Sequence, residues 1–168
     1  MIRKDLISRN PLRLLGYETD EVLLTGAFGA VCARAGVGKT ALLVQLSLNA
    51  LLREQNVLHI SLNDPVDKVD LWYKEVYSNL AATHDAHQAE ILWQELLPRR
   101  FIMNFKVEGF SVPKLEERLV DLVSQNIFTP RMAIIDGFRF EEASTAALSE
   151  LKALAEKQGI HVWFTLRT

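Results

Sequence analysis

Residues 33–40 combine the residue types and the spacing that are needed to bind a phosphate group. The run reads Ala-Arg-Ala-Gly-Val-Gly-Lys-Thr and follows the pattern G-x-x-x-x-G-K-[ST], with Ala33 where the first glycine usually stands. Gly36 and Gly38 let the backbone turn its N–H groups toward an anion, because a Cβ at either position would crowd the anion or restrict the backbone dihedrals. The sequence therefore predicts an anion site formed largely by main-chain N–H groups.

Two side chains at the end of this run add further chemistry. We expect the Lys39 ammonium group to contact the β- and γ-phosphate oxygens of a nucleotide, and the Thr40 hydroxyl to bind a magnesium ion. Residues 41–52 are predicted to form a helix, whose N-terminus adds a partial positive charge at the same place. The apolar run 27–33 supplies the strand that precedes such a loop. The predicted nucleotide-binding residues are Ala35, Gly36, Val37, Gly38, Lys39, Thr40 and Ala41.

A second candidate site residue ends the short apolar run 132–136, Met-Ala-Ile-Ile-Asp, which lies between Pro130 and Gly137. The run is predicted to be a strand that is covered on both faces of a parallel sheet. An acid at the C-terminal end of such a strand emerges where ligands bind. This is the form of a Walker B segment, and we expect Asp136 to hold the magnesium through water, with Thr40 as the other metal-binding residue.

The segments around these candidates alternate between strand-like and helix-like patterns, which predicts an α/β fold with a mostly parallel sheet. Residues 1–25 are predicted to be an irregular or briefly helical lead-in that packs against a single domain formed by residues 26–168. Strands are predicted over residues 27–33, 57–62, 101–107, 132–136 and 160–166, and helices over residues 41–52, 66–80, 85–97, 112–126 and 142–158.

The composition indicates an ordinary soluble globular protein. The chain has 168 residues, of which 49% are hydrophobic and 24% are charged, so that it can bury a full core. A net charge of −2 gives no overall field for nucleic acid or an anionic membrane. No apolar stretch has the length of a signal peptide or a membrane span, so we expect a cytoplasmic protein. The single cysteine, Cys32, is expected to be a small buried hydrophobic residue.

The four histidines do not predict a metal site. His84 and His87 stand beside acidic residues, but no further cysteine or histidine pair completes a set of ligands, so a solvated helix start is the expectation. His59 and His161 fall in predicted strands. We expect these two to be interior residues with satisfied hydrogen bonds.

Four segments resemble the RecA-like P-loop ATPases, including the KaiC-like and DnaB-helicase-like branches: residues 33–40, 57–64 and 132–136, and the closing strand to Thr165. The resemblance covers about residues 24–168, and it implies a P-loop fold in which a five-stranded sheet lies between two helical layers. In sheet order it places the closing strand between the loop strand and strand 132–136, with strands 57–62 and 101–106 beyond. It also implies an open sheet edge beside the loop strand 27–33, which a second copy, a protein partner or missing sequence would cover.

The resemblance implies ATP as the ligand, because the guanine-reading motif Asn-Lys-x-Asp is absent from the sequence. Hydrolysing relatives carry a glutamate after the strand equivalent to 57–62, where it polarises the attacking water. Asn63 and Asp64 stand there in this chain, so Asp64, which is one methylene shorter, is the candidate catalytic residue together with Lys39. Glu141 and Glu142 are weaker candidates for the same role.

The remaining polar residues near the predicted site leave alternatives open. The resemblance implies that Thr165 or Arg167 emerges beside the γ-phosphate as a polar sensor. Arg34 is expected either to touch phosphate or to point to solvent. A neighbouring subunit could supply Arg139 or Arg167 as an arginine finger.

Three functions fit these residues. The first is a slow magnesium-dependent ATPase of RecA-like type, which couples nucleotide binding or hydrolysis to assembly. The second is a nucleotide-responsive binding module with little hydrolysis, to which the Asn63-Asp64 pair points. The third is a small P-loop kinase, which would need an arginine-rich lid, although residues 63–97 contain no arginine.

Overall fold

A parallel β-sheet forms the centre of the computed structural model, which describes residues 2–9, 23–34, 38–62, 64–106, 109–140 and 144–167. The order of its five strands is β1-β5-β4-β2-β3, and every neighbouring pair is parallel. This is the α/β class and the strand order that the sequence predicts, so both predictions are confirmed. The strands are β1 (Phe28–Ala33), β2 (Val57–Ser61), β3 (Arg100–Asn104), β4 (Met132–Asp136) and β5 (His161–Arg167).

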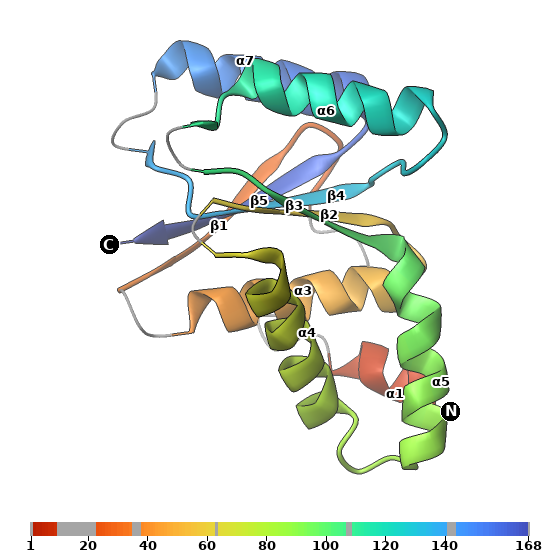
Figure 1. Ribbon diagram of the computed structural model, residues 1–168. Coiled ribbons are helices and arrows are strands. Elements are labelled where there is room, and N and C mark those ends of the chain that lie inside the picture. The colour runs from red at the N-terminus through yellow and green to blue at the C-terminus, as the bar shows by residue number, and fades with distance from the viewer. Residues whose placement is uncertain are drawn as a thin grey trace.

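Helices cover both faces of the sheet and give three layers (Figure 1). Helices α6 (Val112–Ser124) and α7 (Thr145–Gln158) lie on one face. The other face carries α3 (Lys39–Leu52), with α4 (Val66–Leu80), α5 (Ala86–Leu96) and α1 (Ile2–Ser8) beside it. The short 3-10 helix η1 (Leu97–Arg99) leads from α5 into β3.

Each face of the sheet has its own hydrophobic core. Every residue of β2 and of β4 is buried, and their side chains alternate between the two cores. Thus Val57 packs toward α3, whereas Leu58 packs toward α6 and α7. Burial on both faces explains why these strands read as continuous apolar runs.

Local signals set most of the helix ends. The Ser111 hydroxyl accepts the Lys114 N–H at the start of α6, as the sequence predicts. Helix α7 begins at Thr145 rather than at residue 142, because the Ser144 hydroxyl accepts the Ala147 N–H and thereby caps the helix. Residues 141–143 lie outside the described residues. Strand β3 runs over Arg100–Asn104 and is shorter than predicted.

The predicted burial of Cys32 is wrong, because its side chain is exposed. Strand β1 lies at the end of the sheet order, so it has a strand neighbour on one side within the described residues. Phe28 at the start of β1 packs against the core, but Ala30 and Cys32 further along the same face are exposed. The apolar sequence of this edge strand therefore predicted more burial of its side chains than the structure has.

The N-terminal lead-in contains a short helix. α1 places Leu6 in the core beside α3 and α5, with 3% of its surface exposed. Residues 10–22 of the predicted lead-in lie outside the described residues. None of the helices in the described ranges has the length and apolar character needed to cross a membrane.

Candidate functional site

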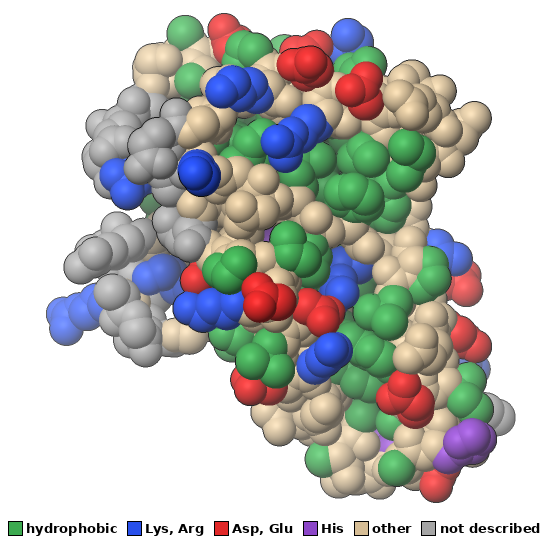
Figure 2. All heavy atoms as spheres, viewed as in Figure 1, with side chains coloured by type: hydrophobic (Ala, Val, Ile, Leu, Met, Phe, Trp, Pro, Cys, Tyr) green, Lys and Arg blue, Asp and Glu red, His purple; other side chains and the backbone are tan. Residues whose placement is uncertain are grey.

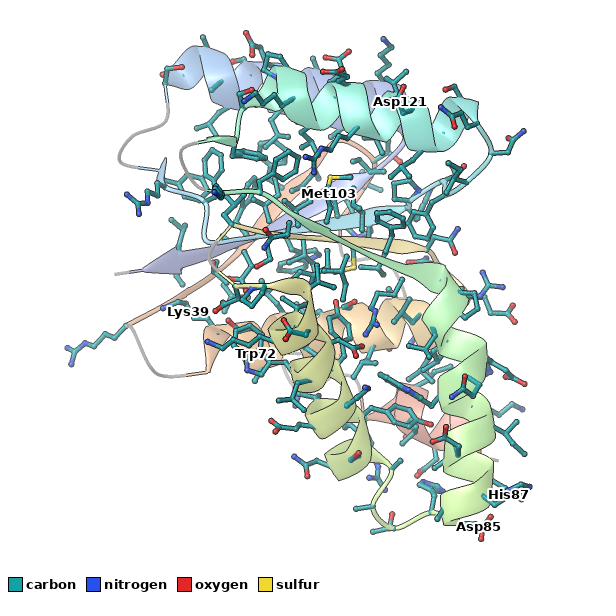
Figure 3. The ribbon with its side chains drawn as sticks, viewed as in Figure 1. Lys39, Trp72, Asp85, His87, Met103 and Asp121 are labelled. Carbon is teal, nitrogen blue, oxygen red and sulfur yellow. The ribbon has the colours of Figure 1, made fainter. Side chains whose placement is uncertain are left out.

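The carboxyl ends of the parallel strands lie along one edge of the sheet, and several predicted site residues meet there. The strand register sets Ser61 of β2 level with Asp136 of β4 and with Asn104 of β3. Helix α3 begins at Lys39, close to this edge (Figure 3). The edge therefore brings together residues from distant parts of the chain.

The start of α3 has no side-chain cap. Gly38, the residue before the helix, has a left-handed φ of 85° and provides no side-chain cap, so it suits a position that disfavours a Cβ. The Lys39 Nζ donates a hydrogen bond to the Arg34 carbonyl oxygen at 3.0 Å. Gly38, Lys39, Thr40 and Ala41 are described, whereas the predicted phosphate-binding residues Ala35, Gly36 and Val37 lie outside the described residues.

Asp136 joins three elements of the site. The Thr40 Oγ1 at the start of α3 donates to Asp136 Oδ2 at 3.4 Å. The Thr165 Oγ1 of β5 donates to Asp136 Oδ1 at 3.2 Å, and it accepts the Gly137 N–H at 3.2 Å. The two predicted magnesium-binding side chains therefore lie in contact although 96 residues separate them.

The carboxyl of Asp136 is in an unfavourable place for a negative charge. Asp136 is only 8% exposed, and burial raises the pKa of its carboxyl above the ordinary value. The negative charge of Asp64 acts in the same direction. Hydrogen bonds from Thr165 and Thr40, together with the Lys39 charge, oppose the increase in pKa without cancelling it. A cation at this position would relieve the buried charge.

Asp64, the candidate for activating water, is held from several sides. The Ser61 Oγ donates to the Asp64 carbonyl oxygen at 2.8 Å, and the Asn104 Nδ2 donates to the same oxygen at 2.5 Å. Its carboxylate forms an ion pair with Lys68 Nζ at 2.9 Å. Sequence reasoning missed Ser61, Asn104 and Lys68. For Ser61 the available signal was a polar residue next to the end of the predicted strand 57–62, whereas Asn104 falls inside the predicted strand 101–107 and gave no such signal.

The other predicted site residues are only partly described. Thr165 contacts Asp136, as above, while nothing is described of the Arg167 side chain. Arg34 and Arg139 are exposed. Asn63, Glu141 and Glu142 lie outside the described residues.

A buried chain of polar groups lies beneath the site, between α3, α4 and β2. The Tyr73 hydroxyl donates to Ser47 Oγ at 2.8 Å, so His59 Nδ1, which is 2.8 Å from the same hydroxyl oxygen, must carry the hydrogen and donate to it. Burial, aided by the nearby Arg100 charge, lowers the pKa of His59 to about 3. His59 is therefore a neutral interior residue, as predicted, and the hydrogen bond of its Nδ1 fixes α4 against β2. The expectation that its hydrogen bonds are satisfied is wrong for Nε2, which is buried and has no partner among the described residues.

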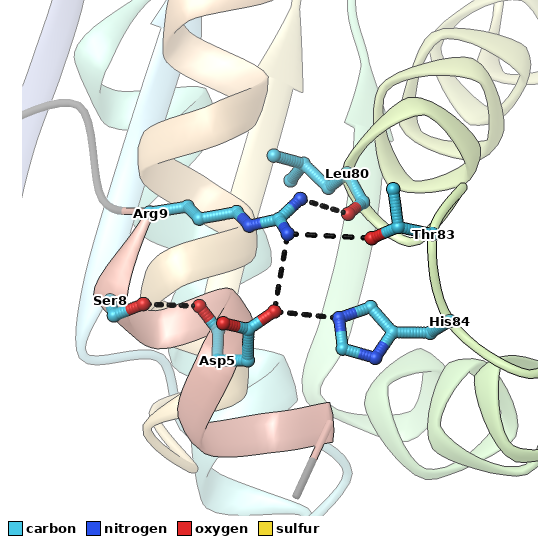
Figure 4. A network of polar contacts seen from close by, with 6 residues as sticks. All are labelled: Asp5, Ser8, Arg9, Leu80, Thr83 and His84. Carbon is cyan, nitrogen blue, oxygen red and sulfur yellow. Dashed lines mark hydrogen bonds and ion pairs between the residues drawn. The ribbon is translucent and has the colours of Figure 1, made fainter.

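His84 corrects a prediction from the sequence. Instead of standing in a solvated helix start, it is half-buried, and its Nε2 lies 2.7 Å from Asp5 Oδ2 of α1 (Figure 4). Asp85 caps α5 by accepting the Gln88 N–H. Within the described residues no group of three or more His, Cys, Asp or Glu side chains could hold a metal ion.

Comparison with known proteins gives no further assignment. No model of a known protein family matches the chain, and no curated protein matches it.

Proposed function

We propose that this chain binds ATP with Mg²⁺ at the carboxyl edge of its sheet and hydrolyses it slowly, as a RecA-like P-loop ATPase. The observation that carries the proposal is the 3.4 Å contact between Thr40 Oγ1 and Asp136 Oδ2. A hydroxyl after the loop lysine and an acid at a strand end are the side chains that hold the metal in P-loop NTPases. Nothing in their sequence spacing alone requires this contact.

The start of α3 supports the phosphate part of the proposal. Its first N–H groups have no side-chain cap, and they carry the positive end of the helix dipole. The Lys39 ammonium group, which contacts the Arg34 carbonyl, would exchange that oxygen for phosphate oxygens when a nucleotide binds. Gly38 leaves the approach open, since a Cβ built on it has no other atom within 4 Å.

The side chains beside this helix fit a divalent cation. Thr40 and Asp136 would hold Mg²⁺, whose charge would offset that of the phosphates. Burial, and to a lesser extent the negative charge of Asp64, raise the pKa of Asp136, so a charged carboxylate is costly at this position without a cation. This cost favours a cation-binding role for Asp136 over a purely structural one.

Asp64 is the candidate for the hydrolysis step. Its carboxylate would accept a hydrogen bond from a water molecule while the water oxygen bonds to the γ-phosphorus and the bond from that phosphorus to the bridging oxygen of ADP breaks. The water proton leaves with the inorganic phosphate. The ion pair with Lys68 competes for the same carboxylate, so we expect slow turnover.

The same ion pair favours a second candidate function, a nucleotide-responsive binding module with little hydrolysis. In that case Asp64 keeps its contact with Lys68 at 2.9 Å when ATP is bound. The chain would then respond to the nucleotide through a change in shape or assembly rather than through turnover.

Calorimetric titration with ATP, with and without Mg²⁺, combined with an assay of phosphate release, tests both functions. We expect Mg²⁺-dependent binding and slow release, and we expect Asp64→Asn to lower release by about 100-fold while the affinity changes little. Lys68→Ala is the matched variant, and it should raise release because it frees the carboxylate. Binding without release would favour the binding module, and folded protein that ignores millimolar ATP would refute both functions.

A further inference from the structure

The outer edge of β3 is open within the described residues. β3 lies at the end of the sheet order and pairs with β2 on one side. Phe101 and Ile102 are only partly buried, and a groove of about 290 Å³ runs between the strand and Arg118, Asp121 and Leu122 of α6. Apolar edge strands of this kind pair readily with another strand unless something covers them.

Helices α4 and α5 form a second open surface next to this edge. They project away from the sheet as an antiparallel pair (Figure 1). The groove between them has a volume of about 670 Å³. The rings of Tyr77 and Trp93, whose centroids are 4.9 Å apart, lie at this groove. Small side chains let another helix approach closely, and the groove is lined by Ala81, Ala82, Ala86 and Ala89.

The charges at this groove are complementary to those of a second copy. Lys74 lines the groove from α4 and Glu90 lines it from α5. Lys74 lies seven residues before the start of the turn 81–85, and Glu90 lies five residues after its end. The positions of the two residues along the helix pair therefore differ by two residues, or about 3 Å. A second copy that is rotated by 180° about an axis parallel to these helices therefore places its Glu90 opposite Lys74 of the first copy. Its Lys74 then lies opposite Glu90 of the first copy. Figure 2 shows hydrophobic side chains between basic and acidic ones along this projection.

A single two-fold axis can pair both surfaces, the β3 edge and the α4–α5 groove, with their counterparts in a second copy. α5 extends away from the plane of the sheet, and α4 and α5 lie on the side of β3 (Figure 1). A two-fold axis perpendicular to a sheet at its edge pairs the edge strand antiparallel with its own copy. We infer that a second copy of this chain docks here, so that β3 pairs with β3 of the second copy and the two α4–α5 pairs pack together.

This dimer leaves the carboxyl edges free. Because the paired β3 strands are antiparallel, the two carboxyl edges face opposite ways, and neither copy contributes residues to the proposed nucleotide site of the other. The inference therefore does not depend on ATP binding.

Sedimentation equilibrium of charge-reversal variants tests the dimer. Lys74→Glu or Glu90→Lys alone makes both rim contacts repulsive, so we expect each variant to dimerise at least about tenfold more weakly than the unaltered protein. An equimolar mixture of the two variants restores opposite charges at both contacts, and it should form a 1:1 heterodimer. Lys157→Glu on α7 is the matched control and should dimerise like the unaltered protein.

A second variant guards against effects on folding, because Lys74 also pairs with Asp70 at 3.1 Å. Ser78 is exposed on the groove wall, so Ser78→Arg should block docking by its size while the thermal melting curve stays unchanged. An unaltered protein that is monomeric at about 100 µM would overturn the inference. So would folded reversal variants that dimerise normally, or a mixture that forms no heterodimer.

Discussion

The two ends of helix α3 differ in how they are held. At its first turn Gly38 offers no side-chain cap, and the neighbouring Lys39 and Thr40 donate hydrogen bonds to the Arg34 carbonyl and to Asp136. At its last turn the Arg3 Nη1 of α1 donates to the Leu52 carbonyl oxygen at 2.6 Å. The same guanidinium bonds Glu95 of α5 through Nη2 at 3.0 Å.

The contacts of α1 extend this support to the turn between α4 and α5. Arg9 donates to the Leu80 carbonyl oxygen at 2.9 Å, and Asp5 contacts both Arg9 and His84 (Figure 4). The helix is thus anchored at one end and left open at the other. Fixed backbone at the far end keeps the first turn in position, and the N–H groups of that turn, which have no side-chain cap, are the ones that a ligand can use.

Lys39→Ala should produce the largest effect on the open end. Loss of the ammonium group removes about 3 kcal/mol of charge-assisted contacts, so we expect ATP affinity to fall by about 100-fold. The melting temperature of the protein without ligand should stay within about 1 °C, because Lys39 is only partly buried. Calorimetry and thermal melts measure the two quantities. Unchanged ATP affinity would show that the first turn of α3 is not a nucleotide-binding end.

Asp136→Asn should separate function from stability. We expect the Mg²⁺-dependent part of ATP affinity to fall by about tenfold, because the carboxylate that attracts the cation is lost. Burial raises the pKa of Asp136, so its contribution to stability is greatest below the ordinary pKa of 3.8 and is lost as the pH rises through the higher folded value. The neutral variant should therefore melt above the unaltered protein at pH 7, and the gap should close near pH 3.

Denaturant unfolding and calorimetry at several pH values check that prediction. A variant that is less stable at pH 7 would mean that the Thr165 and Thr40 hydrogen bonds outweigh the cost of the buried charge. The contacts of Asp136 would then stabilise the fold rather than leave a buried charge for a cation to offset.

Arg3→Ala should give the smallest effect, and it acts at the anchored end. Loss of its bonds to Leu52 and Glu95 should lower the free energy of unfolding by about 1 kcal/mol, which corresponds to about 2–4 °C in melting temperature. ATP affinity should stay the same. A drop in affinity as large as that of Lys39→Ala would show that the two ends are not independent.

The order of helices and strands could be predicted because each depends on local pattern. Alternating or continuous apolar runs predicted the strands. Helix α6 begins after Ser111 and helix α7 ends before Gly159, at the residues expected from the predicted ranges 112–126 and 142–158. The contact of Asp136 with Thr40 also follows from a rule, since carboxyl ends of parallel strands share one edge. Ala35, Gly36 and Val37 stay a prediction.

Contacts between distant elements away from this shared edge could not be predicted. The pairing of His84 with Asp5, the chain from Ser47 through Tyr73 to His59, and the exposure of Cys32 depend on which helix covers which part of the sheet. Side-chain chemistry and periodicity along the chain determined the elements and the residues available for phosphate chemistry. Only tertiary packing decided which of those residues became neighbours. The reason is that groups far away in the sequence bury each residue, supply the charges near it and form its hydrogen bonds.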